Sequence, residues 1–145
     1  TMAKIAEETE KKLSYETAVS RAKNHTPAVS GVISRAACNA ANELKAAAIV
    51  TSTKSGATAR RISQCRPECP IVAVTPSEKV AKSLAFCFGV YPVVAEDQNS
   101  TDAMMANATK IAVENGFANS GDTVVIAAGL DQVGSTNLLK VSVVE

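Results

Sequence analysis

The chain has 145 residues, of which 46% are apolar and 20% charged, a composition typical of one globular domain and not of a disordered segment. Its net charge of +1 and its aromatic content of only 3% argue against a basic or base-stacking surface, so we expect no nucleic-acid partner. We see no signal peptide and no apolar run of about 18 residues, so we expect no membrane partner and a cytoplasmic location.

The amino-terminal part of the chain is predicted to be helical. Residues 1–13 form an amphipathic pattern with Thr1 at the N-cap, and we expect this helix to be the tail of a preceding domain. A short helical segment follows over residues 15–23, and the polar residues 24–27 end it. A longer helix is predicted over residues 28–46, with a stripe of mostly small apolar side chains facing a sheet or helix. This stripe consists of Val29, Val32, Ile33, Ala36, Ala37, Ala40, Ala41 and Leu44.

From residue 47 onward, short apolar runs alternate with helical segments. Pro92 suggests that the third apolar run is an edge strand, since proline cannot donate a hydrogen bond to a neighbouring strand. The predicted strands cover residues 47–52, 70–75, 90–96, 123–129 and 137–144. The predicted helices cover residues 56–65, 75–89 and 100–116; their end signals are Thr75 with Glu78 as a capping box, Gly89, Ser100 or Thr101, and Gly116.

This alternation predicts the fold class. Continuously apolar strands separated by helices indicate a parallel sheet that is covered on both faces. Right-handed crossovers then give a doubly wound α/β fold, a three-layer sandwich with five strands and a central first strand. The last connection, residues 129–136, contains no helix, so we expect the fifth strand to be antiparallel in an otherwise mostly parallel sheet.

The sequence TSTKSGATARR, residues 51–61, leaves the carboxyl end of the predicted first strand, where such folds bind ligands. The helix that follows offers backbone N–H groups, Gly56 permits close approach, and Lys54 adds positive charge. Spacing alone leaves two interpretations open: a phosphate cradle, or a helix that Ser55 caps after a tight turn at Gly56. The hydroxyl donors of the cradle would be Ser52, Thr53, Ser55 and Thr58.

Other patterns do not predict catalysis. The lone histidine, His25, lies in a polar turn and is interpreted as a loop residue. The pair Cys65 and Cys69 lacks the further ligands that zinc needs, so the cysteines are interpreted as buried thiols. Glu96 and Asp97 follow the third strand, where a solvated loop is favoured over a metal site. We therefore expect no catalytic residue and no metal site, and the absence of an acid–base pair argues against a self-standing enzyme.

Five motifs occur in order along the chain: TxSGxTAR, RPxxPIxAVT, GVYPV, GDTVV and TNxLKV. Together they make the sequence resemble the carboxyl-terminal α/β domain of pyruvate kinase, of bacterial type, over essentially the whole chain. The resemblance implies that residues 1–14 end a helix of a preceding barrel domain and that residues 15–145 form the carboxyl-terminal domain. It also implies the five-stranded mixed sheet with flanking helices that the pattern predicts.

The resemblance also implies a function. Pyruvate kinases transfer a phosphoryl group from phosphoenolpyruvate to ADP, giving pyruvate and ATP, and use magnesium and often potassium in the barrel. This chain contains none of the barrel's catalytic segments, so we expect it to be inactive alone and to hold no cofactor. The implied role is to bind an allosteric phosphorylated effector and to contribute to a homotetramer with the rest of the enzyme. The alternative is a purely structural tetramerisation domain with a vestigial phosphate pocket.

Two departures bear on which effector is implied. Met104 stands where bisphosphate-activated eukaryotic members carry an arginine for the second phosphate, and residues 129–137 form a shorter effector loop. Both weaken fructose 1,6-bisphosphate and leave a sugar monophosphate or AMP open. The effector phosphate site that the resemblance carries over consists of Thr53, Lys54, Ser55, Gly56 and Thr58, with Gly134 and Ser135 in the effector loop.

Overall fold

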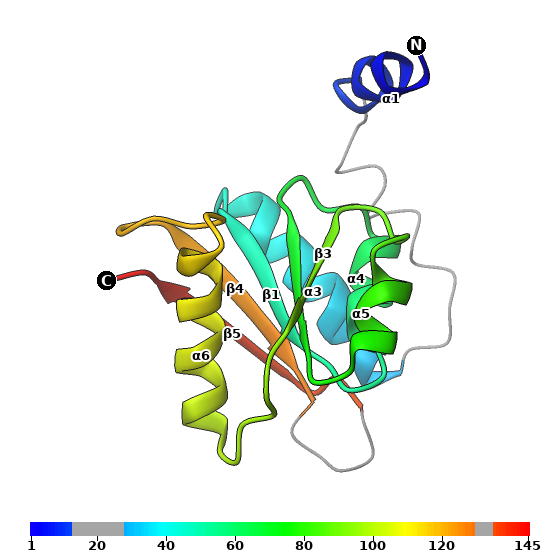
Figure 1. Ribbon diagram of the computed structural model, residues 1–145. Coiled ribbons are helices and arrows are strands. Elements are labelled where there is room, and N and C mark those ends of the chain that lie inside the picture. Colours follow the sequence, from blue (N-terminus) through cyan, green and yellow to red (C-terminus); the bar gives the residue numbers. More distant parts are fainter. Residues whose placement is uncertain (13–27, 130–134) are drawn as a thin grey trace.

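The computed structural model describes residues 1–12, 28–129 and 135–145, and its centre is a five-stranded sheet of order β3-β2-β1-β4-β5 (Figure 1). Strands β1 to β4 run parallel, and β5 is antiparallel to β4. The prediction of a mostly parallel sheet with a central first strand, an edge third strand and an antiparallel last strand is confirmed. The strands are β1 (Ala48–Ser52), β2 (Ile71–Thr75), β3 (Val90–Val94), β4 (Thr123–Ala128) and β5 (Leu138–Val143).

Helices cover both faces of this sheet, as the three-layer prediction requires. Successive side chains of a strand point to opposite faces, so Ile49 of β1 enters one core while Val50 enters the other. The first core lies under three helices and the second lies under one (Figure 1). The three helices are α3 (Val29–Glu43), α4 (Ala57–Gln64) and α5 (Glu78–Leu84); the single helix is α6 (Thr101–Glu114).

Helix α3 forms where the sequence predicts it, and the predicted buried stripe is confirmed in part: Ala37 and Ala41 are buried. Val29, Val32 and Leu44 are exposed, although the pattern assigned them to the core. Serine is tolerated on the buried face because the Ser34 hydroxyl donates to the Ser30 carbonyl at 2.7 Å, which satisfies it within the helix. Small side chains there let α3 approach its neighbours closely. The buried residues are Ser30, Ser34, Ala37, Cys38 and Ala41.

Two helix ends differ from the sequence prediction and one agrees. The N-cap of α5 is Ser77, whose hydroxyl accepts from the Val80 N–H at 3.3 Å, and not Thr75. Thr75 instead stays in β2, where its carbonyl accepts a hydrogen bond from the Ala95 N–H. Helix α5 also ends at Leu84, well before Gly89. Ser100 caps α6 as predicted.

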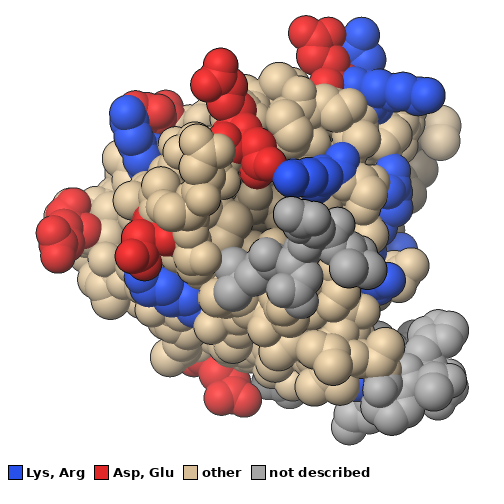
Figure 2. All heavy atoms as spheres, turned by 90° about the horizontal axis from the view of Figure 1, so that it is seen from below, with Lys and Arg blue, Asp and Glu red and all other residues tan. Residues whose placement is uncertain are grey.

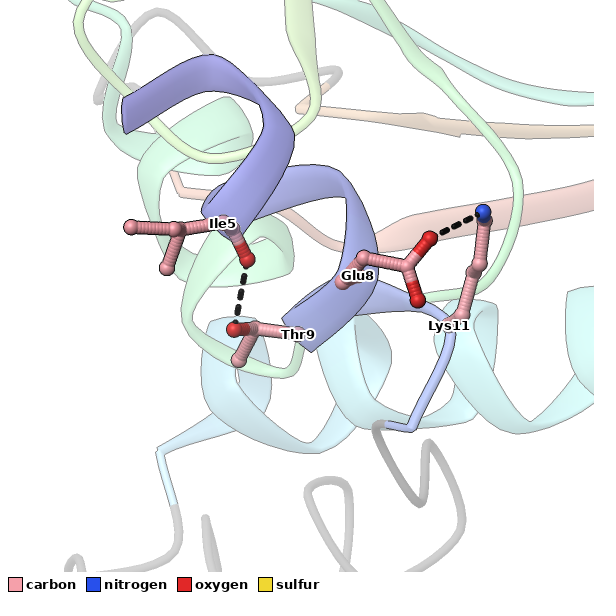
Figure 3. A network of polar contacts seen from close by, with 4 residues as sticks. All are labelled: Ile5, Glu8, Thr9 and Lys11. Carbon is pink, nitrogen blue, oxygen red and sulfur yellow. Dashed lines mark hydrogen bonds and ion pairs between the residues drawn. The ribbon is translucent and has the colours of Figure 1, made fainter. Parts of the chain in front are cut away.

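Helix α1 (Met2–Glu10) confirms the predicted amino-terminal helix and stands apart from the sheet in Figure 1. Figure 3 shows its polar contacts: the Thr9 hydroxyl donates to the Ile5 carbonyl at 2.7 Å, and Lys11 pairs with Glu8 at 2.7 Å. Thr1 occupies the N-cap position but makes no side-chain cap hydrogen bond, and none of the helix's side chains is buried. The predicted helical segment 15–23 and its end at 24–27 lie outside the described residues.

Candidate functional site

A turn of four residues connects β1 to α4 at the carboxyl edge of the sheet. The Thr53 N–H donates to the Val74 carbonyl at 2.9 Å, which prolongs the pairing of β1 with β2 by one residue. The buried Thr53 hydroxyl accepts from the Gly56 N–H at 2.9 Å and closes the turn. Thr53 is therefore a structural part of the turn, because this contact engages its oxygen as an acceptor.

Gly56 is the N-cap of α4 and has a left-handed backbone with φ of 83°. A Cβ added here would lie 2.8 Å from Nη1 of Arg60, 3.1 Å from Cδ2 of Leu84 and 3.2 Å from Cγ1 of Val80. Gly56 therefore relieves a tight turn, and it also lets the turn lie against α5. The alternative of Ser55 as N-cap is wrong: its hydroxyl accepts only from the nearby Ala57 N–H, at 3.4 Å.

Arg60 holds the turn from the outside. Its Nη1 donates to the Ser55 carbonyl at 2.9 Å, and its Nη2 donates to the Ser83 hydroxyl of α5 at 2.8 Å. The guanidinium thereby links the turn to α5. The sequence gives no signal for this contact, because nothing in it pairs Arg60 with Ser83.

The first turn of α4 is joined to the last connection of the chain. The hydroxyls of Thr58 and Thr136, both buried, lie 2.6 Å apart. Ser135 packs against the start of the same connection, since a Cβ on Gly129 would lie only 2.5 Å from the Ser135 carbonyl oxygen. Ser135, a predicted effector-loop residue, directly precedes Thr136, which contacts α4. Gly134, the other predicted loop residue, lies outside the described residues. Sequence reasoning did not single out Thr136.

Lys54 is the charged residue of the predicted site, and it is exposed. Its ammonium lies 2.6 Å from the Asp97 carboxylate, with 77% of the lysine side chain and 46% of the aspartate side chain exposed. Asp97 follows β3, so it reaches the same edge of the sheet as the turn after β1. The shared carboxyl edge was a sequence signal that could have found this pair. Asp97 was instead assigned to a solvated loop.

We call residues 53–59, the turn after β1 and the first residues of α4, the cradle, because backbone N–H groups there are potential hydrogen-bond donors. The ladder of α4 begins when the Arg60 N–H donates to the Gly56 carbonyl at 3.0 Å, so the N–H groups of Thr58 and Ala59 precede the first intrahelical bond. The positive end of the helix dipole lies there, and Lys54 precedes the first helical residue, Ala57, in the same turn. This arrangement can bind an anion.

The surroundings of the cradle carry mixed charge. Figure 2 shows the lower face of the molecule, where basic side chains are scattered among acidic ones. Within the described ranges, no group of three or more His, Cys, Asp or Glu side chains is placed to hold a metal ion. No helix in the described part of the chain is both long and apolar enough to cross a membrane. His25 lies outside the described residues.

The fold and cradle define the class of protein: a doubly wound α/β domain with a candidate anion site at the carboxyl edge of its sheet. The family model for the pyruvate kinase alpha/beta domain matches residues 31–142. The chain therefore belongs to the pyruvate kinase alpha/beta domain family, in agreement with the resemblance of its motifs.

Curated relatives support this assignment. The chain is 46% identical to the pyruvate kinase of Clostridium acetobutylicum over 148 residues, covering 100% of the chain and 31% of that protein. It is 39% identical to the enzyme of Clostridium perfringens, covering 97% of the chain and 31% of that protein. For the enzyme of Staphylococcus epidermidis the identity is 41%, covering 99% of the chain and 25% of that protein. The chain spans less than a third of the length of these relatives.

Proposed function

We propose that the chain is the effector-binding and assembly domain of a pyruvate kinase, and that the cradle binds the phosphate group of a small effector. The observation that carries the proposal is the turn after β1, where Lys54 and Ser55 directly precede the N-cap of α4 at the carboxyl edge of the sheet. Helix N-termini attract phosphate through their free N–H groups and partial positive charge. Ser55 adds an exposed hydroxyl group at this turn, whereas the buried Thr58 hydroxyl is engaged with Thr136 and would have to exchange that contact for the ligand.

Within this proposal, a ligand with one phosphate is favoured over a bisphosphate. Met104 packs against the apolar core beneath α6, where it supplies no positive charge to the cradle. Asp97 adds a negative charge beside Lys54, which disfavours a second phosphate nearby. A sugar monophosphate or AMP is therefore the proposed class of effector, with fructose 1,6-bisphosphate as the weaker candidate.

Calorimetric titration tests the cradle. We expect heat on adding a hexose 6-phosphate or AMP, and a binding constant about tenfold weaker in Lys54→Met, the loss of one contact to a charged group. Lys45→Met is the matched control, because Lys45 is equally exposed at 77% and pairs with Glu68 at 3.4 Å, away from the cradle. If the folded chain gives no heat with any phosphate ligand, the cradle is only a helix start.

The activity of the parent protein is a further part of the proposal. The parent would transfer a phosphoryl group from phosphoenolpyruvate to ADP, and the magnesium and potassium ions of that reaction would be bound outside this chain. Helix α1, with its exposed Met2 and Ile5, would continue from the barrel domain and bury these side chains against it. The chain alone should release no pyruvate in a coupled assay. Turnover by the chain alone would contradict this division of roles.

A purely structural role is the second candidate, and exposed apolar side chains favour it. Val29, Val32 and Leu44 are exposed on α3, and Val141 and Val143 are exposed on β5. Strand β5 is also an edge strand, with a side open to pairing with another chain. These surfaces would contribute to the proposed tetramer. Sedimentation, together with phosphate titration, distinguishes the two candidates in part. A strictly monomeric chain that binds phosphate would support the effector role and not the structural one. Self-association without phosphate binding would support the structural role.

A further inference from the structure

All four cysteines are free thiols, and they gather on the sheet face that α3, α4 and α5 cover. Cys38 lies within α3, and Cys65 is the C-cap residue of α4. Both belong to the buried core on this face, while Cys69 and Cys87 pack against it and are partly exposed. Two thiols from adjacent helices are therefore enclosed together at the end of α4 that lies opposite the cradle.

Cys38 and Cys65 meet at one carbonyl group. The Cys38 thiol donates to the Ile62 carbonyl, with its Sγ 3.7 Å from the oxygen. The Cys65 N–H donates to the same oxygen at 3.0 Å. The shared carbonyl oxygen and the common core cluster place the two thiols next to each other, and each changes the pKa of the other. The two cysteines thus come together from neighbouring helices, as a disulfide requires, since its Cβ atoms lie about 4 Å apart.

The two thiols are chemically unequal. The neighbouring Cys38 thiol lowers the pKa of Cys65 below its ordinary value, and the Arg35 guanidinium acts in the same direction, although burial opposes both. The Cys65 side chain, followed by burial, raises the pKa of Cys38. The thiolate is the reactive form of cysteine, so Cys65 is the nucleophile of the pair and Cys38 its partner.

We propose that Cys38 and Cys65 form a reversible disulfide when the protein meets a peroxide. The Cys65 thiolate attacks one peroxide oxygen; the S–O bond forms, the O–O bond breaks, and the released hydroxide takes a proton to become water. The Cys38 sulfur then attacks the Cys65 sulfenic sulfur, the S–S bond forms, and the hydroxyl leaves as a second water. Two thiols and one hydrogen peroxide thus give one disulfide and two waters.

The position of Cys65 provides the route for the oxidant. Cys65 ends α4, and the residues on either side of the following Pro67, Arg66 and Glu68, are exposed. Helix ends open locally more readily than helix centres, so Cys65 is reached without unfolding the sheet. The disulfide would then tie α4 to the adjacent helix α3 on the same face of the sheet, and a thiol reductant would reverse it.

Peptide mapping of the oxidised chain tests the proposal. A protease that cleaves after glutamate separates the cysteines, because Glu43, Glu68 and Glu78 divide the sequence between them. Residues 17–43 then carry Cys38, residues 44–68 carry Cys65, and residues 69–78 carry Cys69. After brief treatment with hydrogen peroxide, we expect fragments 17–43 and 44–68 to be joined, with a mass lower by two hydrogens, and to separate on reduction.

Variants sharpen the assignment. Cys38→Ala and Cys65→Ala should each abolish the joined fragment, and Cys69→Ala should leave it unchanged. Circular dichroism and the melting temperature of each reduced variant check that the domain is folded, and the wild-type map does not depend on any variant. Retention of all four free thiols, oxidation of single cysteines only, or a disulfide to Cys69 or Cys87 in the wild-type chain would overturn the proposal.

Discussion

The two ends of α4 are held in different ways. At its first turn, Gly56, Thr58 and Arg60 make hydrogen bonds to the preceding turn, to Thr136 and to α5, and the charges of Lys54 and Asp97 lie in solvent beside them. At its last turn, Cys65 lies in the apolar core against Cys38. The two proposals assign a different kind of response to each end of this one short helix. Exposed polar contacts can be exchanged for those of a ligand, whereas enclosed thiols change by covalent chemistry.

The largest expected effect is at the backbone of the first turn. Gly56→Ala should lower the free energy of unfolding by about 3 kcal/mol, because it adds a left-handed backbone penalty to a steric clash with α5. Gly116→Ala is the matched control: its φ is 77°, but nothing lies within 4 Å of the added Cβ, so about 1 kcal/mol is expected. Urea unfolding measures both. Equal losses would show that α5 does not constrain the turn.

Two threonine substitutions compare the loss of a hydrogen-bonded buried hydroxyl, at Thr58, with the loss of a buried hydroxyl that has no hydrogen-bond partner among the described residues, at Thr51. Thr58→Val should destabilise the fold by about 2 kcal/mol, because it leaves the buried Thr136 hydroxyl without this partner. Thr51→Val should instead stabilise by about 1 kcal/mol, because the buried Thr51 hydroxyl has no hydrogen-bond partner among the described residues. Thermal and urea unfolding should give shifts of opposite sign. Shifts of the same sign would contradict the hydrogen-bond assignment.

The thiol end of α4 should respond to alkaline pH. Burial raises the pKa of Cys69 to about 11 from its ordinary value of 9.0. The folded state therefore holds this proton more tightly than the unfolded state, so the associated stability is complete below pH 9.0 and is lost as the pH rises toward 11. Between about pH 8 and about pH 10 the loss should be about 1 kcal/mol. Cys69→Ala should lose less over the same interval, and an identical pH profile would refute the burial effect.

The smallest expected effect on stability is at the exposed ion pair. Asp97→Asn should change the free energy of unfolding by less than about 0.5 kcal/mol, since both partners are largely exposed. If the cradle binds phosphate, the same variant should bind it a few-fold more tightly, because Lys54 is released and a negative charge is removed. Glu68→Gln, at the matched Lys45 pair, should leave phosphate binding unchanged. Weaker binding in Asp97→Asn would mean that Asp97 helps to position the ligand.

Much of the fold could be predicted because its signals are local and repeated. The apolar runs around Val50, Val72 and Val125 are buried on both faces, so they read as parallel strands without knowledge of their neighbours. Pro92 indicated an edge strand because proline lacks a donor for one neighbour. The face of α3 was misjudged in part because the apolar pattern included Val29 and Val32, whereas the helix buries the polar residue Ser34.

Part of the candidate site could also be predicted, because its residues are neighbours along the chain. Lys54, Ser55 and Gly56 are adjacent in sequence, so their common turn was visible as a motif. Asp97 follows β3 and Thr136 precedes β5, so the order of strands in the sheet brings both residues to this turn. A sequence shows which residue types are close along the chain. It does not show which side chains from separate strands meet in space.

The sequence by itself determined that this chain forms a doubly wound α/β domain, that its first strand is central, and that a glycine-containing turn begins the next helix. These features depend on hydrophobic periodicity and on backbone preference, which are properties of local sequence. Only the tertiary structure decided that Asp97 pairs with Lys54, that Thr58 meets Thr136, and that the thiols of Cys38 and Cys65 touch. Such contacts join residues far apart in the chain, and their geometry exists only once the helices have packed on the sheet.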